Sequence, residues 1–244
     1  MAATFLALDT GSPRVSVALA RDGALVASRW VEQERSSARL LAMIREVLDE
    51  AGIGVAGLGG IDGIAVLRGP GSFTGLRIGL ATVLGLHQAT GVRATAIPTL
   101  PVLAAAAGGE APLAPIVIAA VDALRGDWSA QAFAAGRPVG EMALVPGPGL
   151  PRLAHRSGAS EAGDTGAVVV TGFGVSRLAA LPDWPAAIRL IEPGPLAPTA
   201  ALLAASPETD WDPAHLTTAI YSRPPAITLP RPRAAAPVPP LSVP

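Results

Sequence analysis

The glycine-rich stretch 69–79 is the part of this sequence whose residue types and spacing could do chemistry. Glycine-rich turns that open a helix present free backbone N–H groups, and such groups can hold phosphate. A P-loop needs a Lys-Ser/Thr pair after its last glycine, but here Leu76 and Arg77 follow Gly75. The dinucleotide-binding pattern fails as well, because Thr74 stands where its last glycine belongs. The stretch therefore matches neither kind of nucleotide-binding loop.

Nucleophilic and metal-based chemistry find few candidates elsewhere. Ser72 lacks the Gly-x-Ser-x-Gly frame of a hydrolase nucleophile, and a role as helix cap suits it better. The histidines His87, His155 and His215 are far apart in the sequence and have no local partner. Cysteine is absent, which excludes disulfides and thiolate metal sites. With 18 Lys and Arg against 19 Asp and Glu, the charge gives no footprint for binding nucleic acid alone.

A helix must follow the glycine-rich stretch and position it. The pattern predicts this helix over 72–90, closed by a left-handed C-cap at Gly91. Gly71, Gly75 and Gly79 are four residues apart, so they form a stripe along one side. Glycine costs about 1 kcal/mol relative to alanine inside a helix, so this helix needs a close neighbour. The neighbour is either the protein's own sheet or another subunit, and we favour another subunit.

The remaining elements repeat one plan of three strands, a helix, a strand and a helix. An aspartate ends the first strand of each repeat, Asp9 in the first and Asp122 in the second. We expect strands over 4–8, 14–20, 24–31, 61–67 and 92–97, and again over 115–121, 128–134, 139–145, 167–171 and 188–191, with further helices over 37–51, 100–107 and 198–205.

This order resembles the duplicated ribonuclease-H-like fold of actin, Hsp70 and sugar kinases. The fold is an α/β fold of two βββαβα-type halves. We expect an N-terminal half over 1–108, a C-terminal half over 109–218 and an extended Pro-rich tail over 219–244.

Several motifs resemble one family in particular, the bacterial TsaB (YeaZ) family. The most specific is the stretch 69–79 together with Leu6-Ala7-Leu8-Asp9-Thr10. The similarity covers about residues 4–230. The other matching motifs are Pro98-Thr99-Leu100, Asp122-Ala123 followed by Arg125-Gly126-Asp127, Thr171-Gly172-Phe173-Gly174 and Tyr221-Ser222-Arg223-Pro224.

The resemblance implies a non-catalytic subunit that dimerises with the catalytic subunit TsaD and activates it. TsaD transfers a threonylcarbamoyl group to adenosine 37 of tRNAs that read codons beginning with A, and the ATPase TsaE completes the complex. By the same resemblance, this chain binds no cofactor or metal tightly, and ATP or ADP and metal belong to the partner subunits. It contacts tRNA only through the complex. We also expect a homodimer when it is isolated, no membrane segment and a cytoplasmic location.

The family's partner contact is a four-helix bundle with two helices from each chain, which correspond here to 37–51 and 72–90. Ser36 and Ser37 depart from the histidine and threonine that many relatives carry before the first of these helices. The residues that we expect at the partner interface are Leu40, Leu41, Ile44, Gly71, Ser72, Phe73, Thr74, Gly75, Arg77, Ile78 and Gly79.

A degenerate nucleotide site is the other implication of the superfamily, whose ATP-using members hold phosphate in a hairpin turn of each half. Asp9 and Thr10 correspond to the first turn, Asp122 to the second, and Gly172 and Gly174 to the adenosine loop. The structural alternative is that these aspartates cap their own turns. The alternative function is an autonomous ATP-dependent enzyme, either a small-molecule kinase or an ATPase.

Overall fold

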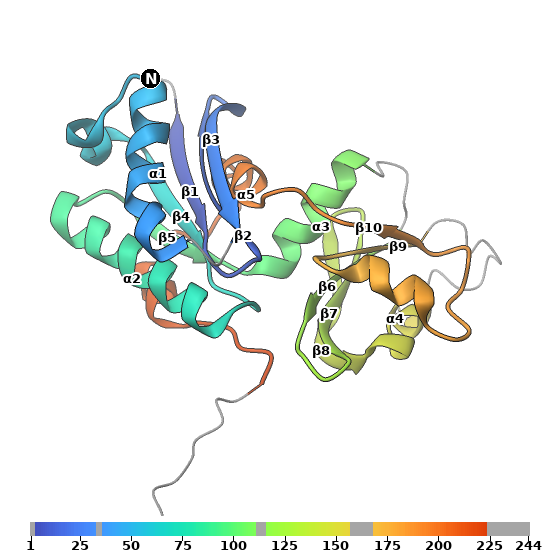
Figure 1. Cartoon of the computed structure of the whole chain (residues 1–244). Helices are drawn as coiled ribbons and strands as arrows, with labels where there is room; N and C mark the ends of the chain where they lie inside the picture. The colour runs from blue at the N-terminus through green and yellow to red at the C-terminus, as the bar shows by residue number, and fades with distance from the viewer. Residues whose placement is uncertain (1–2, 33–35, 111–115, 157–167, 224–244) are drawn as a thin grey trace, which may run out of the picture.

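Two mixed β-sheets form the core of the computed structural model, which describes residues 3–32, 36–110, 116–156 and 168–223 (Figure 1). In this part of the chain each sheet has five strands, in the equivalent orders β3-β2-β1-β4-β5 and β8-β7-β6-β9-β10. The strands of the first sheet are β1 (Thr4–Asp9), β2 (Arg14–Arg21), β3 (Ala24–Glu32), β4 (Gly63–Leu67) and β5 (Ala94–Ile97). Those of the second are β6 (Ile116–Asp122), β7 (Asp127–Ala134), β8 (Arg137–Pro146), β9 (Val168–Thr171) and β10 (Arg189–Ile191).

The pairing within the two sheets is the same. The first strand of each sheet runs antiparallel to the second and parallel to the fourth, so β1 pairs with β2 and β4 as β6 pairs with β7 and β9. The fifth strand is parallel to the fourth in both. The duplicated ribonuclease-H-like fold predicted from the sequence is therefore confirmed.

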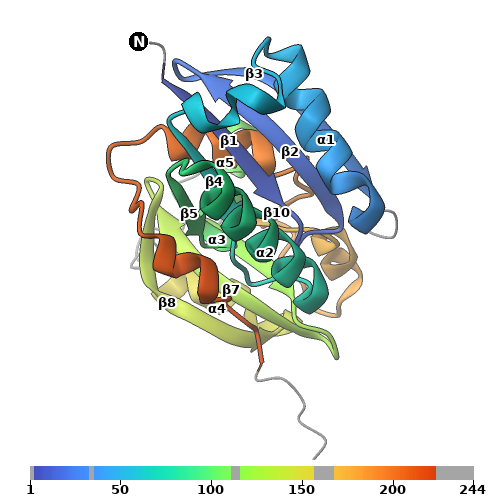
Figure 2. The ribbon, with the colours of Figure 1, turned by 90° about the vertical axis from the view of Figure 1, so that its left-hand side faces the viewer.

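Helices cover both faces of the sheets. The α-helices are α1 (Ser36–Glu50), α2 (Phe73–Thr90), α3 (Thr99–Glu110), α4 (Pro151–Arg156) and α5 (Ala197–Ala204). Short 3-10 helices are η2 (Val55–Gly60), η3 (Gly147–Gly149), η6 (Val175–Ala180) and η7 (Pro213–Thr217). Figure 2 shows α1 and α2 side by side over the outer face of the first sheet. Within the described residues, no helix is both long and apolar enough to cross a membrane.

Alternation along the strands divides the apolar side chains between separate clusters. On β1, Phe5 and Ala7 point into a central cluster, whereas Leu6 and Leu8 point to the cluster under α1 and α2. This is expected of a strand that is buried on both faces, because successive side chains point to opposite sides. All six residues of β1 are buried.

The central cluster joins the two sheets through an exchange of helices. The helix α3 follows the last strand of the first sheet, yet it packs against β6 and β7 of the second. Conversely, α5 follows β10 but packs against β1 and β2. The boundary at 108/109 therefore remains a proposal about domains, since each half lends a helix to the other. Of the expected tail over 219–244, the part from 224 onward lies outside the described residues.

Candidate functional site

A cleft of about 800 Å³ opens between the two halves of the molecule. One wall is the turn Gly11 to Pro13 after β1 together with the first turn of α2. The opposite wall is the end of β6 with Leu124, and Phe173 after β9. Residues 221–223 complete the lining. The cleft thus lies at the carboxyl ends of the central strands, where open α/β sheets bind ligands.

The helix α2 begins and ends as the sequence predicts. The Ser72 hydroxyl accepts a hydrogen bond from the Gly75 N–H at 3.3 Å, and the Ser72 N–H donates to the Gly11 carbonyl at 2.8 Å. Ser72 is therefore the N-cap, and these contacts give it no role as a nucleophile. At the other end Gly91 has a left-handed backbone, with φ of 73°, and its N–H returns to the His87 carbonyl.

The glycine stripe of α2 packs on the protein's own first half, so the expectation that it faces another subunit is wrong. Gly75 and Gly79 are buried. A Cβ atom at Gly79 would lie 2.2 Å from the Thr10 hydroxyl oxygen and 3.1 Å from a methyl group of Val66. A Cβ atom at Gly71 would lie 2.8 Å from the carbonyl oxygen of the β1–β2 turn. The glycines let the helix approach its own sheet closely.

Two of the leucine and isoleucine positions expected at the interface are also core residues. Leu40 and Ile44 are 2% and 4% exposed, in the cluster beneath α1. The prediction that they lie at a partner interface is therefore wrong. Periodicity identifies an apolar helix face, but it does not say whether the protein's own sheet or a partner covers that face.

Other residues of the expected interface do reach the surface. Leu41 on α1 is 67% exposed, and Phe73 on α2 is 41% exposed. Thr74 and Arg77 are exposed as well. We call these four residues the α1–α2 face. Ser72 and Ile78 are half-buried beside it.

Asp9 is fully buried where β1 ends, and its carboxylate closes its own turn. One oxygen, Oδ1, accepts hydrogen bonds from the N–H groups of Gly11 and Ser12 at 3.0 and 3.2 Å. The other oxygen, Oδ2, has no hydrogen-bond partner among the described residues. Burial raises the pKa of Asp9 to about 6, although the bonds from Ser12 and Gly11 act in the opposite direction. Thr10 is buried beside it, against Gly79.

Asp9→Asn is expected to stabilise the protein at neutral pH. Because the folded-state pKa of Asp9 is raised from 3.8 to about 6, the folded state alone binds this proton between those values. The free energy of unfolding therefore falls as the pH rises through this window. The cost reaches about 3 kcal/mol above it, from about 1.4 kcal/mol for each pKa unit. Asparagine keeps an acceptor for both N–H groups but carries no charge.

Urea unfolding of the wild type and of Asp9→Asn, at a series of pH values between about 4 and about 7.5, measures this effect. This range spans the pKa values of Asp9 in the unfolded and folded states. The advantage of the variant should grow with pH and level off above about pH 6. Parallel stability curves for the two proteins would show that Asp9 is ionised without cost.

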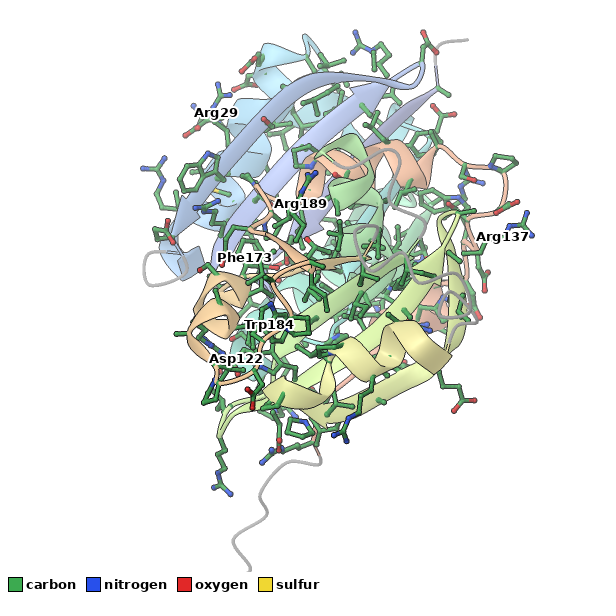
Figure 3. The ribbon with its side chains drawn as sticks, turned by 90° about the vertical axis from the view of Figure 1, so that its right-hand side faces the viewer. Arg29, Asp122, Arg137, Phe173, Trp184 and Arg189 are labelled. Carbon is green, nitrogen blue, oxygen red and sulfur yellow. The ribbon has the colours of Figure 1, made fainter. Side chains whose placement is uncertain are left out.

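Asp122 is engaged by its own half. Its Oδ1 accepts from the Leu124 N–H at 2.8 Å, and its Oδ2 pairs with an Arg177 nitrogen at 2.7 Å. Asp122 and Phe173 are labelled at the same end of the second sheet in Figure 3. The turn that follows Asp122 is therefore closed in the manner of the turn after Asp9.

Glu192 fills the loop that corresponds to an adenosine site. Its two carboxylate oxygens accept from the N–H groups of Gly174 and Ser176 at 2.8 and 2.9 Å. Burial raises the pKa of Glu192, but the backbone bonds from Ser176 and Gly174, the Ser176 hydroxyl and the charge of Arg14 together outweigh it, so the pKa is lowered. At Gly172 a Cβ atom would lie 1.9 Å from the Ala120 carbonyl oxygen, so only glycine fits there. Sequence reasoning missed Glu192, and its place directly after the short strand β10, whose last residue Ile191 is buried, is the available signal.

These contacts decide what the cleft can hold. A nucleotide phosphate needs free N–H donors, but Asp9 and Asp122 already accept hydrogen bonds from N–H groups of the two turns that correspond to the phosphate-binding hairpins. The described residues therefore do not fit a phosphate chain at either position. They also contain no group of three or more His, Asp or Glu side chains arranged to hold a metal ion.

A family model and two curated proteins that match this chain all carry names from threonylcarbamoyladenosine biosynthesis. Residues 31–141 match a protein-family model described as "TsaD: tRNA N6-adenosine threonylcarbamoyltransferase". The chain is 39% identical over 120 residues to a Haemophilus influenzae protein named tRNA threonylcarbamoyladenosine biosynthesis protein TsaB. It is 35% identical over 122 residues to the Escherichia coli K12 protein of that name. These matches cover 49% and 50% of this chain and 49% and 51% of the relatives, so it spans about half the length of the curated relatives it matches.

Solved structures match over more of the chain. YeaZ from Pseudomonas aeruginosa superimposes with a TM-score of 0.65 at 32% identity, covering 83% of this chain and 91% of that one. A structure described as an uncharacterised protein with similarity to peptidase YeaZ from Pseudomonas aeruginosa gives a TM-score of 0.66 at 33% identity, covering 83% and 90%.

Proposed function

Because this chain belongs to the TsaB (YeaZ) family, we propose that it acts in the biosynthesis of threonylcarbamoyladenosine in tRNA. Its role there is that of a non-catalytic scaffold. It binds a TsaD-like catalytic subunit and activates it for N6-threonylcarbamoylation of adenosine 37, in tRNAs that read codons beginning with A.

The observation that carries the proposal is the α1–α2 face. Leu41 and Phe73 leave 67% and 41% of their surface in water, on two helices that lie side by side (Figure 2). Large exposed apolar side chains on adjacent helices support a protein–protein contact. The guanidinium group of Arg77 lies 3.9 Å from the centre of the Phe73 ring, so an aromatic and an arginine side chain meet there. Phenylalanine and arginine are both enriched at protein–protein interfaces relative to the rest of the surface.

The turns that line the cleft have N–H groups already bonded to carboxylates of this chain, which supports a scaffold rather than a catalyst. The buried carboxylate of Asp9, the pair of Asp122 with Arg177 and the bonds from Glu192 use up groups that an ATP-dependent enzyme keeps for its substrate.

The partners follow from the proposed role. A TsaE-like ATPase joins the TsaD-like subunit. This chain does not bind tRNA by itself and contacts it only through the complex. In the absence of a partner, two copies of the chain pair through the same α1–α2 face. The complex works in the cytoplasm.

The alternative, an autonomous ATP-dependent enzyme, draws support from the position of the cleft between the two halves. Phosphate release by the purified chain that Asp9→Ala abolishes would favour this alternative.

Co-elution tests the proposal directly. The purified chain and the TsaD-like protein of the same organism, mixed at micromolar concentration, should elute together from a sizing column. Separate elution of two folded proteins over this range, with phosphate release by the lone chain, would contradict the scaffold role.

A further inference from the structure

Two sequence motifs that the proposed function leaves unused meet across the cleft. Asp127, of the Arg125-Gly126-Asp127 motif, begins β7 of the second sheet. Arg223, of the Tyr221-Ser222-Arg223 motif, is the last described residue of the chain. The guanidinium group of Arg223 forms an ion pair with the Asp127 carboxylate. About one third of each side chain is exposed.

The segment that carries Arg223, residues 218–223, is fastened to the first half, and we call it the strap. The Ile220 N–H donates to the Arg68 carbonyl at 2.7 Å, just beyond the end of β4. The strap lies so close there that a Cβ atom at Gly69 would be 2.2 Å from the Ile220 carbonyl oxygen. Figure 1 shows the strap, in red, leaving the first half beside α2.

Tyr221 fixes the strap to α2. Its ring lies 5.0 Å from the ring of Phe73, and its hydroxyl accepts a hydrogen bond from the Arg77 Nε at 3.2 Å. Phe73 and Arg77 belong to the α1–α2 face. The strap therefore contacts a proposed partner surface with one residue and the second half of the molecule, two residues later, with another.

Apart from the strap, the two halves of the molecule are joined mainly by apolar packing. Away from the strap, the central apolar cluster with α3 and α5 connects the two sheets, and the Ala197 N–H donates to the Ser16 hydroxyl at 3.1 Å. A packed apolar core does not deform easily. An ion pair of this exposure is weak by itself and can be broken and remade. The strap is therefore the connection between the halves that can be broken and remade while the core keeps the two sheets joined.

We infer that the strap is a latch between the two halves, closed by Arg223 and Asp127, and that it holds Phe73 and Arg77 in the arrangement that a partner binds. The second part rests on the proposed function, whereas the first part does not. The latch therefore makes the arrangement of Phe73 and Arg77 on the α1–α2 face depend on the angle between the two halves.

Distances between spin labels test the latch without any partner. The sequence contains no cysteine, so Gln88→Cys on α2 and Glu141→Cys on β8 give two unique, exposed labelling positions. Arg223→Glu places two negative charges together, and the distance distribution should become broader with a longer mean. The double change Arg223→Glu with Asp127→Arg restores opposite charges and should return the distribution to that of the wild type. Arg125→Glu, the same charge change two residues before Asp127, is the matched control and should leave it unchanged.

An unchanged distribution in Arg223→Glu, with a melting curve that shows a folded protein, would overturn the latch. So would a failure of the double change to restore the distribution.

The affinity for the TsaD-like protein tests the coupling. Arg223→Glu should weaken binding about 5-fold or more, a common size for coupling between sites, and the double change should recover it. Equal affinities in spite of an opened cleft would overturn the coupling and leave the latch standing. If the wild-type chain does not bind at all, the proposed function fails, and the label distances still decide the latch.

Discussion

Gly79→Leu is expected to prevent stable folding of the chain. Even the Cβ atom of a side chain there would lie 2.2 Å from the Thr10 hydroxyl oxygen and 3.1 Å from Val66, both of which are buried. The rest of the leucine side chain has no space, so α2 would have to lift from β1 and β4. The gain in helix propensity on replacing glycine is only about 1 kcal/mol. The clash should cost about 4 kcal/mol or more, which is a large part of the stability of a typical domain.

The matched control is Gly85→Ala on the same helix. A Cβ atom at Gly85 would have no atom within 4 Å, so the change should stabilise the protein by about 1 kcal/mol. Thermal and urea unfolding of the two variants measure both effects. A folded Gly79→Leu protein of near wild-type stability would mean that α2 does not pack closely on its own sheet.

Leu41→Glu is expected to abolish partner binding and leave the fold intact. Leu41 is 67% exposed, so a charge there costs the isolated chain little. In a complex, the same charge would be buried against apolar surface without a partner, which is strongly unfavourable. The affinity for the TsaD-like protein should fall at least about 30-fold, equivalent to about 2 kcal/mol. Isothermal titration calorimetry measures it.

Leu202→Glu is the control for this change. Leu202 is 40% exposed and lies on α5, which packs against the opposite face of the first sheet from α1 and α2. The Leu202→Glu variant should bind the TsaD-like protein with the affinity of the wild type. Equal loss of affinity in both variants, or loss in neither, would argue against the α1–α2 face as the contact.

The sequence predicts the fold well because its signals are local. Strand periodicity, the Ser72 cap and the Gly91 C-cap depend on residues within a few positions of one another, and the structure confirms them. The repeated order of elements then indicates the duplicated fold. The exchange of α3 and α5 between the sheets escapes this reasoning, because periodicity does not say which sheet an apolar helix covers.

The candidate site is harder to predict, for a physical reason. The spacing of Gly71, Gly75 and Gly79 correctly indicates a close neighbour for the helix, yet it cannot identify the neighbour, which is Thr10 and the adjoining sheet. Which face of α1 is exposed is equally hidden, so Leu40 is buried where Leu41 is exposed.

Long-range pairs are the least visible in the sequence. Glu192 meets the N–H of Gly174 from 18 residues away, and Arg223 meets Asp127 from 96 residues away. The residues next to each partner in the sequence do not indicate these pairs, because only the fold brings the partners together.

We propose that this chain activates a catalyst and does not transform a substrate itself. The most direct measurement is the threonylcarbamoyladenosine content of tRNA, determined by nucleoside mass spectrometry after reconstitution with the TsaD-like and TsaE-like proteins and threonylcarbamoyl-adenylate. We predict that the modified nucleoside accumulates when wild-type chain is present, and hardly at all when it is omitted or replaced by Leu41→Glu. Equal accumulation with and without the chain would contradict its role as an activator.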